Sequence, residues 1–268
     1  MNLMEQTFQR LKLEGKTALI PFLTIGDPDM DTTVAIIKEL EAAGADILEL
    51  GVPYSDPLAD GPVIQRASQR ALKHQVSLKS CMEAAVRARE EGVKMPFILF
   101  TYYNPILQMG LDTFFEEVTA HGISGLIVPD LPIEESGELR RKADALGVSF
   151  VPLVAPTSNE RIAQIVSGAS GFVYCVSSLG VTGERSSFYQ GVEQFIETIR
   201  QYTDLPVAIG FGISTAEQVA HFSEICDGVV VGSAIVRQVE NAIPLLEKEE
   251  TRQEGLIQIR SFVSQLKG

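Results

Sequence analysis

Glu49 is the first residue of this 268-residue chain whose type and position indicate chemistry. It lies in the run Asp46-Ile47-Leu48-Glu49-Leu50-Gly51, one position before an expected strand ends. Alternation along a strand places Glu49 on the same face as Ile47. A carboxylate among apolar neighbours is costly to bury unless it is paired or functional. An ion pair with an arginine or lysine is one interpretation, and the strand-end position favours a catalytic role as the other.

A second carboxylate follows in the loop 52–62, which is rich in turn-forming and acidic residues. The loop brings Asp60 just before the next expected helix, so Glu49 and Asp60 can converge over one cavity. Asp60 is equally well placed to cap the helix that begins near Pro62. Asp56 can brace the turn before Pro57. The spacing alone leaves catalysis and capping open for Asp60.

Three glycine-bearing loops follow later apolar runs and indicate a phosphate site. They are 179–185, 210–214 and 232–234. Glycine lets backbone N–H groups approach an anion closely, and a helix that starts after Gly232-Ser233 adds its positive N-terminal end. We therefore expect a phosphorylated small molecule bound by Gly183, Gly212, Gly232 and Ser233, although any single glycine can simply permit a tight turn. The stretch 179–188 is long enough to be a lid, or else an exposed loop tip.

Several other kinds of site are disfavoured. His74, His121 and His221 fall in expected helices or helix ends, away from these loops. No His/Asp/Glu cluster has metal-ligand spacing, and no Ser–His–acid arrangement can be assembled. We expect no metal in this chain.

Composition restricts the partners and the location. The net charge is −13 and no Lys/Arg cluster occurs, so nucleic acid would meet a repulsive surface. No apolar stretch is long enough to span a membrane, and the polar start lacks the order of a secretory signal. Cys81, Cys175 and Cys226 are widely spaced without a CxxC, which favours reduced, structural thiols. These features predict a cytoplasmic protein.

The elements that must position these residues alternate regularly. Eight short apolar runs are separated by helical patterns: 17–24, 46–50, 96–101, 125–128, 148–154, 171–176, 206–209 and 228–231. Near-continuous apolar runs are typical of parallel strands covered by helices. The count and length predict one domain, 1–268, folded as a (β/α)₈ barrel (TIM barrel) with an extra amphipathic helix within 1–13. An open doubly wound sheet is the rival, but the turn Thr24-Ile25-Gly26-Asp27-Pro28 lacks its GxGxxG motif.

Beyond these inferences, the run 48–62 (Leu-Glu-Leu-Gly-Val-Pro-Tyr-Ser-Asp-Pro-Leu-Ala-Asp-Gly-Pro) resembles the signature of the tryptophan synthase α chain family. The resemblance also includes the segments 21–28, 65–68, 102–105, 128–132, 180–183 and 210–214. It covers essentially the whole chain.

This resemblance implies a lyase of tryptophan biosynthesis, which cleaves indole-3-glycerol phosphate to indole and glyceraldehyde 3-phosphate without a cofactor of its own. Glu49 would be the acid/base, Asp60 would accept a hydrogen bond from the indole N–H, and Thr182 would orient Asp60. The ring needs an apolar slot. Its expected lining is Phe22, Phe100, Tyr102, Ile127, Leu153, Tyr174, Thr182 and Phe211.

The resemblance also implies an α₂β₂ heterotetramer with a pyridoxal-phosphate β chain, which receives the indole. Pro53, Asp56 and Asn104 are the expected contacts, since their loops rim the site. Two other functions compete with this one. A sugar-phosphate epimerase or isomerase would share the phosphate loops, and a binding module would hold the ligand and switch a partner on without turnover.

Overall fold

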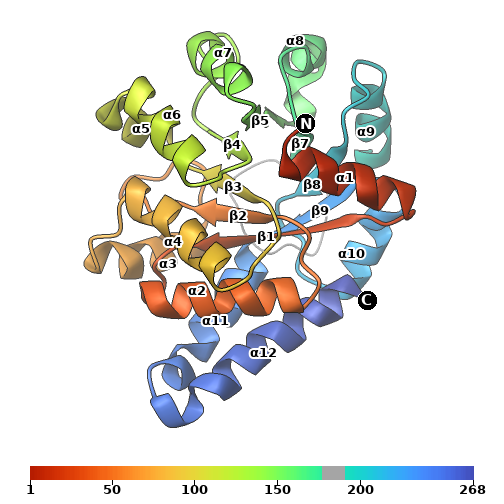
Figure 1. The fold of residues 1–268 in the computed structure, drawn as a ribbon. Coiled ribbons are helices and arrows are strands. Elements are labelled where there is room, and N and C mark those ends of the chain that lie inside the picture. The colour runs from red at the N-terminus through yellow and green to blue at the C-terminus, as the bar shows by residue number, and fades with distance from the viewer. Residues whose placement is uncertain (177–190) are drawn as a thin grey trace.

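The computed structural model describes residues 1–176 and 191–268, and within them a central ring of strands is surrounded by helices (Figure 1). All strand pairs are parallel, in the order β5-β4-β3-β2-β1-β9-β8-β7-β6. The strands are β1 (Ala18–Thr24), β2 (Leu48–Gly51), β3 (Phe97–Phe100), β4 (Gly125–Ile127), β5 (Ser149–Phe150), β6 (Leu153–Val154), β7 (Val173–Val176), β8 (Val207–Gly210) and β9 (Gly228–Val231).

The ring closes through β5 and β6, which are two parts of one barrel strand. β5 pairs with β4 and β6 pairs with β7. Between them, Val151 N–H donates to Leu126 O at 2.9 Å, and Pro152 O accepts from Tyr174 N–H at 3.0 Å. Pro152 has no N–H to continue the ladder, which accounts for the break in the predicted strand 148–154. The predicted (β/α)₈ barrel is therefore confirmed, with its fifth strand divided.

Each strand separates two apolar layers, because alternate side chains point to opposite faces. The outward side chains pack under the helices. The inward side chains fill the barrel and include Ile20, Phe22, Ile47, Ile98, Phe100, Ile127, Val151, Phe172, Tyr174, Ala208 and Val230. The register pairs Glu49 with Phe22 and Ile98, so Glu49 shares the interior face with Ile47 as the alternation predicts.

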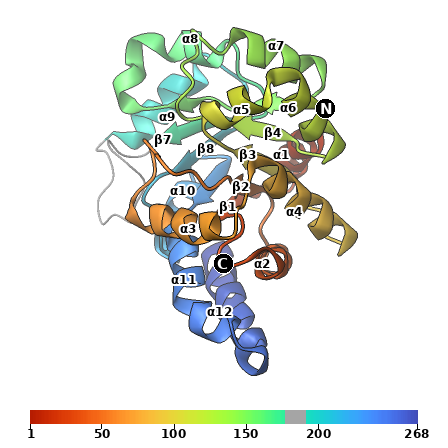
Figure 2. The same cartoon turned by 90° about the vertical axis from the view of Figure 1, so that its left-hand side faces the viewer.

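The helices cover the outside of the ring and alternate with the strands. They are α1 (Leu3–Leu13), α2 (Met30–Ala42), α3 (Pro62–Lys73), α4 (Leu78–Glu90), α5 (Tyr103–Met109), α6 (Leu111–Ala120), α7 (Gly137–Ala145), η1 (Pro156–Arg161), α8 (Ile162–Val166), α9 (Val192–Arg200), α10 (Ala216–Ser223), α11 (Ser233–Leu246) and α12 (Glu249–Lys267). The N-cap of α2 is Asp29, whose side chain accepts from Thr32 N–H at 2.8 Å. α11 and α12 pack side by side in both ribbon views (Figures 1 and 2).

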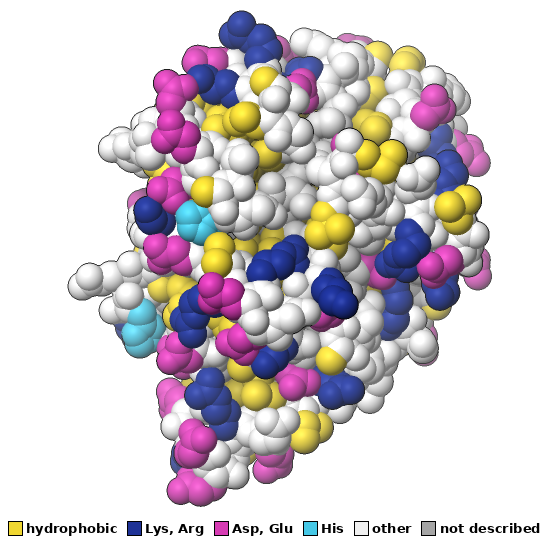
Figure 3. Space-filling view, viewed as in Figure 1, with side chains coloured by type: hydrophobic (Ala, Val, Ile, Leu, Met, Phe, Trp, Pro, Cys, Tyr) yellow, Lys and Arg dark blue, Asp and Glu magenta, His cyan; other side chains and the backbone are white. Residues whose placement is uncertain are grey.

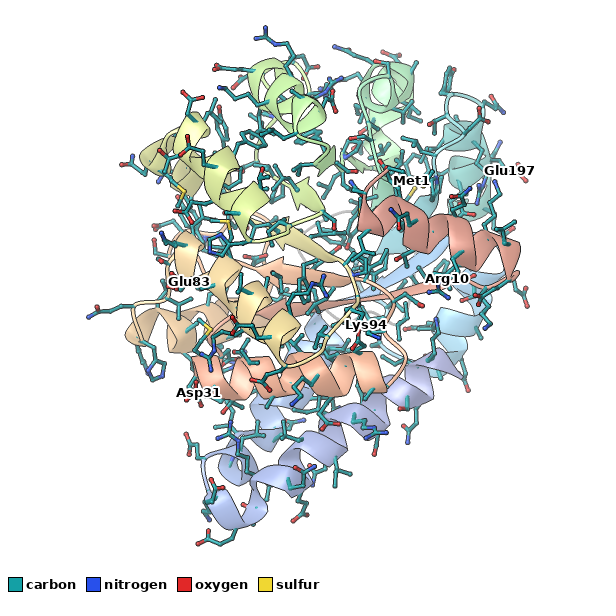
Figure 4. The ribbon with its side chains drawn as sticks, in the orientation of Figure 1. Met1, Arg10, Asp31, Glu83, Lys94 and Glu197 are labelled. Carbon is teal, nitrogen blue, oxygen red and sulfur yellow. The ribbon has the colours of Figure 1, made fainter. Side chains whose placement is uncertain are left out.

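The predicted N-terminal helix is α1, and it lies across the N-terminal ends of the strands. Met1 and Arg10 mark its course in Figure 4. The Asn2 side chain donates to Ser124 O at 3.0 Å and to Ser149 Oγ at 2.8 Å, just before β4 and at the start of β5. Met4 and Phe8 are buried, and Phe8 lies 5.3 Å from Phe172 between ring centroids. α1 therefore covers the N-terminal ends of the strands, and we expect the functional site at their C-terminal ends.

The surface and helices add two observations. Lysine and arginine side chains are interspersed with aspartate and glutamate on the face seen in Figure 3. Across residues 1–176 and 191–268, no helix is both long and apolar enough to cross a membrane.

Candidate active site

A cavity lies at the C-terminal ends of the strands and brings most of the predicted site residues together. It is lined by Phe22, Glu49, Asp60, Ile64, Phe100, Tyr174, Phe211, Gly212, Val230, Gly232 and Ser233. Both predicted acids, four of the predicted ring contacts and three predicted phosphate residues thus face one space. Thr182 and Gly183 fall outside the described residues.

Glu49 lies on β2 with only 1% of its surface exposed. Its Oε1 atom is buried and has no hydrogen-bond partner within the described ranges. Among the described residues, no lysine or arginine forms an ion pair with it either. Burial raises the pKa of Glu49 well above its ordinary value. A carboxyl group with a raised pKa holds its proton more readily than an exposed one, so it can donate that proton and, once ionised, accept one back.

Asp60 is held by Tyr102, which comes from the end of the neighbouring strand β3. The Tyr102 hydroxyl bonds the Asp60 carboxylate and accepts from Ala59 N–H at 3.0 Å. Burial raises the pKa of Asp60 to about 6, and the Tyr102 bond opposes this rise. Gly61, and not Asp60, is the N-cap of α3, so the capping interpretation of Asp60 is wrong.

Aromatic rings form the walls between these acids. Phe22 and Phe100 meet edge to face at 5.4 Å between centroids, and Tyr174 and Phe211 meet likewise at 5.7 Å. Burial, followed by the nearby Glu49, raises the pKa of the Tyr174 hydroxyl well above its usual range, so it stays protonated. The walls therefore suit a flat apolar ring.

Three predicted pocket residues do not line this cavity. Tyr102 lies behind Asp60 and orients it instead. Ile127 is fully buried in the barrel interior. Leu153 lines a neighbouring cavity with Asp130 and Arg161. Conversely, sequence reasoning missed Ile64 and Val230, although the inward alternation of 228–231 marks Val230 and the first turn of the helix after Asp60 marks Ile64.

The opposite end of the cavity is built from backbone. Gly212 has a φ of 98° and follows Phe211, itself at a φ of 73°. Gly232 precedes the 14-residue helix α11, which begins at the buried Ser233. A helix N-terminus presents N–H groups and a partial positive charge, which suits a phosphate group.

The predicted partner contacts lie on the rim. Pro53 belongs to the loop after β2, where the exposed Asp56 accepts from Ser55 Oγ at 2.5 Å. Asn104 on α5 lies 3.5 Å from the Tyr54 hydroxyl, which ties the two rim segments together.

No group of three His, Cys, Asp or Glu side chains in the described part of the chain is arranged to hold a metal ion. The barrel and its cavity define a (β/α)₈-barrel protein in which two buried carboxyl groups, aromatic rings and a helix N-terminus line one cavity at the C-terminal ends of the strands.

Comparison with known proteins identifies the family. The family model for the tryptophan synthase alpha chain matches residues 8–266, and the chain belongs to that family. The tryptophan synthase alpha chain of Bacillus pumilus is 51% identical over 93% of this chain and 93% of its own length. That of Geobacillus sp. (strain WCH70) is 49% identical over 94% and 95%.

Solved structures agree with this assignment. Mycobacterium tuberculosis tryptophan synthase superposes with a TM-score of 0.87 at 34% identity, covering 99% of this chain and 96% of the other. The alpha chain of Legionella pneumophila gives 0.87 at 32% identity, covering 100% and 96%. The predicted family and enzyme class are confirmed: the chain is a lyase of tryptophan biosynthesis that cleaves indole-3-glycerol phosphate.

Proposed function

We propose that Glu49 carries the proton transfers of this cleavage. Protonation of indole C3 by the Glu49 carboxyl prepares the bond between C3 and the hydroxyl-bearing glycerol carbon to break. The resulting carboxylate takes the hydroxyl proton as that bond breaks and the aldehyde forms. The products are indole and glyceraldehyde 3-phosphate. The supporting observation is the Glu49 carboxyl itself, buried and unpaired within the described ranges, on the same cavity as Asp60.

Asp60 stabilises the charge that develops on the ring. Protonation at C3 places positive charge on the indole nitrogen, and an ionised carboxylate accepting from that N–H lowers the energy of the cation. Tyr102 and Ala59 hold Asp60 for this contact. The two acids thus have different tasks.

The phosphate group of the substrate binds at Gly212, Gly232 and Ser233, with Gly183 as a further proposed contact outside the described residues. This end offers backbone N–H groups and the positive end of α11 in place of basic side chains. Binding energy gained here orients the ring between Glu49 and Asp60. We propose no metal or organic cofactor for this chain.

The chain works with a pyridoxal-phosphate β chain in an α₂β₂ complex that receives the indole. Two large apolar side chains on the rim are exposed, Leu58 at 77% and Leu107 at 52%. They flank the predicted contacts Pro53, Asp56 and Asn104. Exposed apolar groups beside a functional cavity are typical of a partner surface.

We place this single-domain protein in the cytoplasm. Its three cysteines are all buried and free, as is usual in a reducing compartment.

The test is product formation by the purified chain from indole-3-glycerol phosphate, alone and with a tryptophan synthase β chain. We expect equal amounts of indole and glyceraldehyde 3-phosphate, at a rate that rises with the β chain. An isomerised sugar phosphate without indole would favour the epimerase alternative. Ligand binding without any product, together with activation of the β chain, would favour the binding module.

A further inference from the structure

A network of four charged side chains lies outside the cavity and joins three segments that line it. Arg70 of α3 donates to both carboxylate oxygens of Asp27, from Nε at 2.7 Å and Nη2 at 2.9 Å. Its Nη1 donates to Glu240 of α11 at 2.7 Å. Arg66, one turn earlier on α3, donates to both oxygens of Glu240 at 2.8 and 2.7 Å.

The network is partly removed from solvent and balanced in charge. Asp27 is 1% exposed, whereas the Arg70 and Glu240 side chains are 24% and 22% exposed. Two acids meet two arginines through paired hydrogen bonds, which fix geometry more closely than a single contact does. The Arg66 hydrogen bond is the main cause that lowers the pKa of Glu240 to about 2, so that carboxylate stays charged.

Each joined segment carries part of the site. α3 begins two residues after Asp60, and Asp27 follows the strand that carries Phe22. α11 begins at Ser233, seven residues before Glu240, which is about 10 Å along a helix. α3 and α11 lie side by side (Figure 2). None of the four charged groups lines the cavity.

We infer that Asp27, Arg66, Arg70 and Glu240 are positioning residues that hold the N-terminal end of α11 at a set distance from Asp60. This rests on the proposed function, since it assigns that helix end to the substrate phosphate. Glu49 lies on β2, outside the network. Asp60 is held separately, because the Tyr102 hydroxyl bonds its carboxylate and accepts from Ala59 N–H at 3.0 Å. Loss of the network therefore shifts the phosphate end and leaves the proton donor in place.

The test compares Arg70→Met and Glu240→Gln with Lys267→Met. Lys267 makes an ion pair with Asp46 and donates to Thr17 O at 3.1 Å, at the opposite end of the barrel. Its removal provides a matched loss of a half-buried ion pair away from the cavity. Steady-state indole formation gives kcat and KM, equilibrium dialysis gives the Kd for inorganic phosphate, and thermal unfolding gives Tm.

We expect Arg70→Met to raise KM and the phosphate Kd roughly 10- to 100-fold with kcat within about threefold of wild type. Glu240→Gln is the milder change and should raise KM and the phosphate Kd by a smaller factor, again with little effect on kcat. Arg70→Lys should restore part of the phosphate affinity that Arg70→Met loses. Lys267→Met should lower Tm while KM and the phosphate Kd stay within about twofold, as expected of remote sites.

An unchanged phosphate Kd in both Arg70→Met and Glu240→Gln would overturn the inference. An equal rise of KM in Lys267→Met would overturn it too, because the loss of any comparable ion pair would then raise KM through lower stability. Absence of indole from wild type and Lys267→Met would instead count against the proposed function.

Discussion

At the scale of single residues, the site combines two carboxyl groups with opposite requirements. In the proposed cleavage Glu49 needs a dry setting in which it can hold a proton, and β2 places its side chain among inward apolar neighbours. In the same proposal Asp60 needs to be ionised when the ring becomes charged, and the hydrogen bond from the Tyr102 hydroxyl favours the ionised form. The different surroundings of the Glu49 and Asp60 carboxyl groups thus suit one to proton transfer and the other to stabilising a positive charge.

The raised pKa of Glu49 makes a prediction about stability. The folded chain keeps a proton that the unfolded chain releases near the ordinary value of 4.5. Stability is therefore lost as pH rises from that value through the raised pKa. Glu49→Gln should raise the free energy of unfolding by roughly 1–3 kcal/mol near pH 8 and by little near pH 4. Urea unfolding at both pH values checks this, with the exposed Glu116→Gln as the control. A mutant less stable at pH 8 would contradict it.

The contact between Tyr102 and Asp60 makes a prediction about pH dependence. Asp60 must be ionised to accept from the indole N–H, so kcat should fall as pH drops through about 6. Tyr102→Phe removes the bond that lowers this pKa, and the acid limb of the profile should move to higher pH. The Ala59 N–H also loses its acceptor, at about 1–3 kcal/mol of stability. Tyr202→Phe, on an exposed ring, is the control. An unmoved acid limb in Tyr102→Phe would count against this role.

At the scale of the elements, two strands end in glycine because aromatic rings of neighbouring strands lie across them. A Cβ on Gly51 of β2 would lie 2.3 Å from Phe22 Cζ, and one on Gly210 of β8 would lie 2.3 Å from the Tyr174 hydroxyl oxygen. These distances are far below contact, so one of the groups must move. The strand ends therefore shape the slot for the ring.

Gly51→Ala and Gly210→Ala should each push an aromatic ring out of place. We expect about 1–3 kcal/mol of lost stability and a raised KM for indole-3-glycerol phosphate. Gly137→Ala is the matched control, because a Cβ at this first residue of α7 meets no atom within 4 Å. Steady-state kinetics and thermal unfolding of the three variants measure both effects. Wild-type KM in both strand-end variants would show that the rings do not define the slot.

At the scale of the whole molecule, the barrel separates stability from chemistry. α1 packs at the N-terminal ends of the strands, whereas the cavity lies at their C-terminal ends. Met4, fully buried in α1, is a means of testing this separation. Met4→Ala should lower the free energy of unfolding by about 2–5 kcal/mol and leave kcat and KM of the folded fraction unchanged. A KM shift in this variant, measured well below its Tm, would show that the two ends are coupled.

Sequence reasoning reached the barrel and its acids because both follow from local pattern. Apolar runs reveal parallel strands, and period-two alternation puts Glu49 inside. The role of Tyr102 was not predicted, since it depends on a side-chain contact between the end of β3 and the loop that follows the neighbouring strand β2. The network around Arg70 was missed for the same reason: Asp27 and Glu240 are 213 residues apart in the sequence. Contacts between elements depend on tertiary packing, which no local pattern contains.

The central claim is that Glu49 moves the protons of the cleavage, and single-turnover indole formation tests it most directly. Wild type and Glu49→Gln are each saturated with indole-3-glycerol phosphate, and indole is followed over time in the presence of the β chain. Substrate affinity should stay within a few fold, because Gln keeps the size and polarity of the side chain. Indole formation should fall by at least about 10²- to 10⁴-fold. A Glu49→Gln variant that binds substrate and releases indole near the wild-type rate would contradict the account.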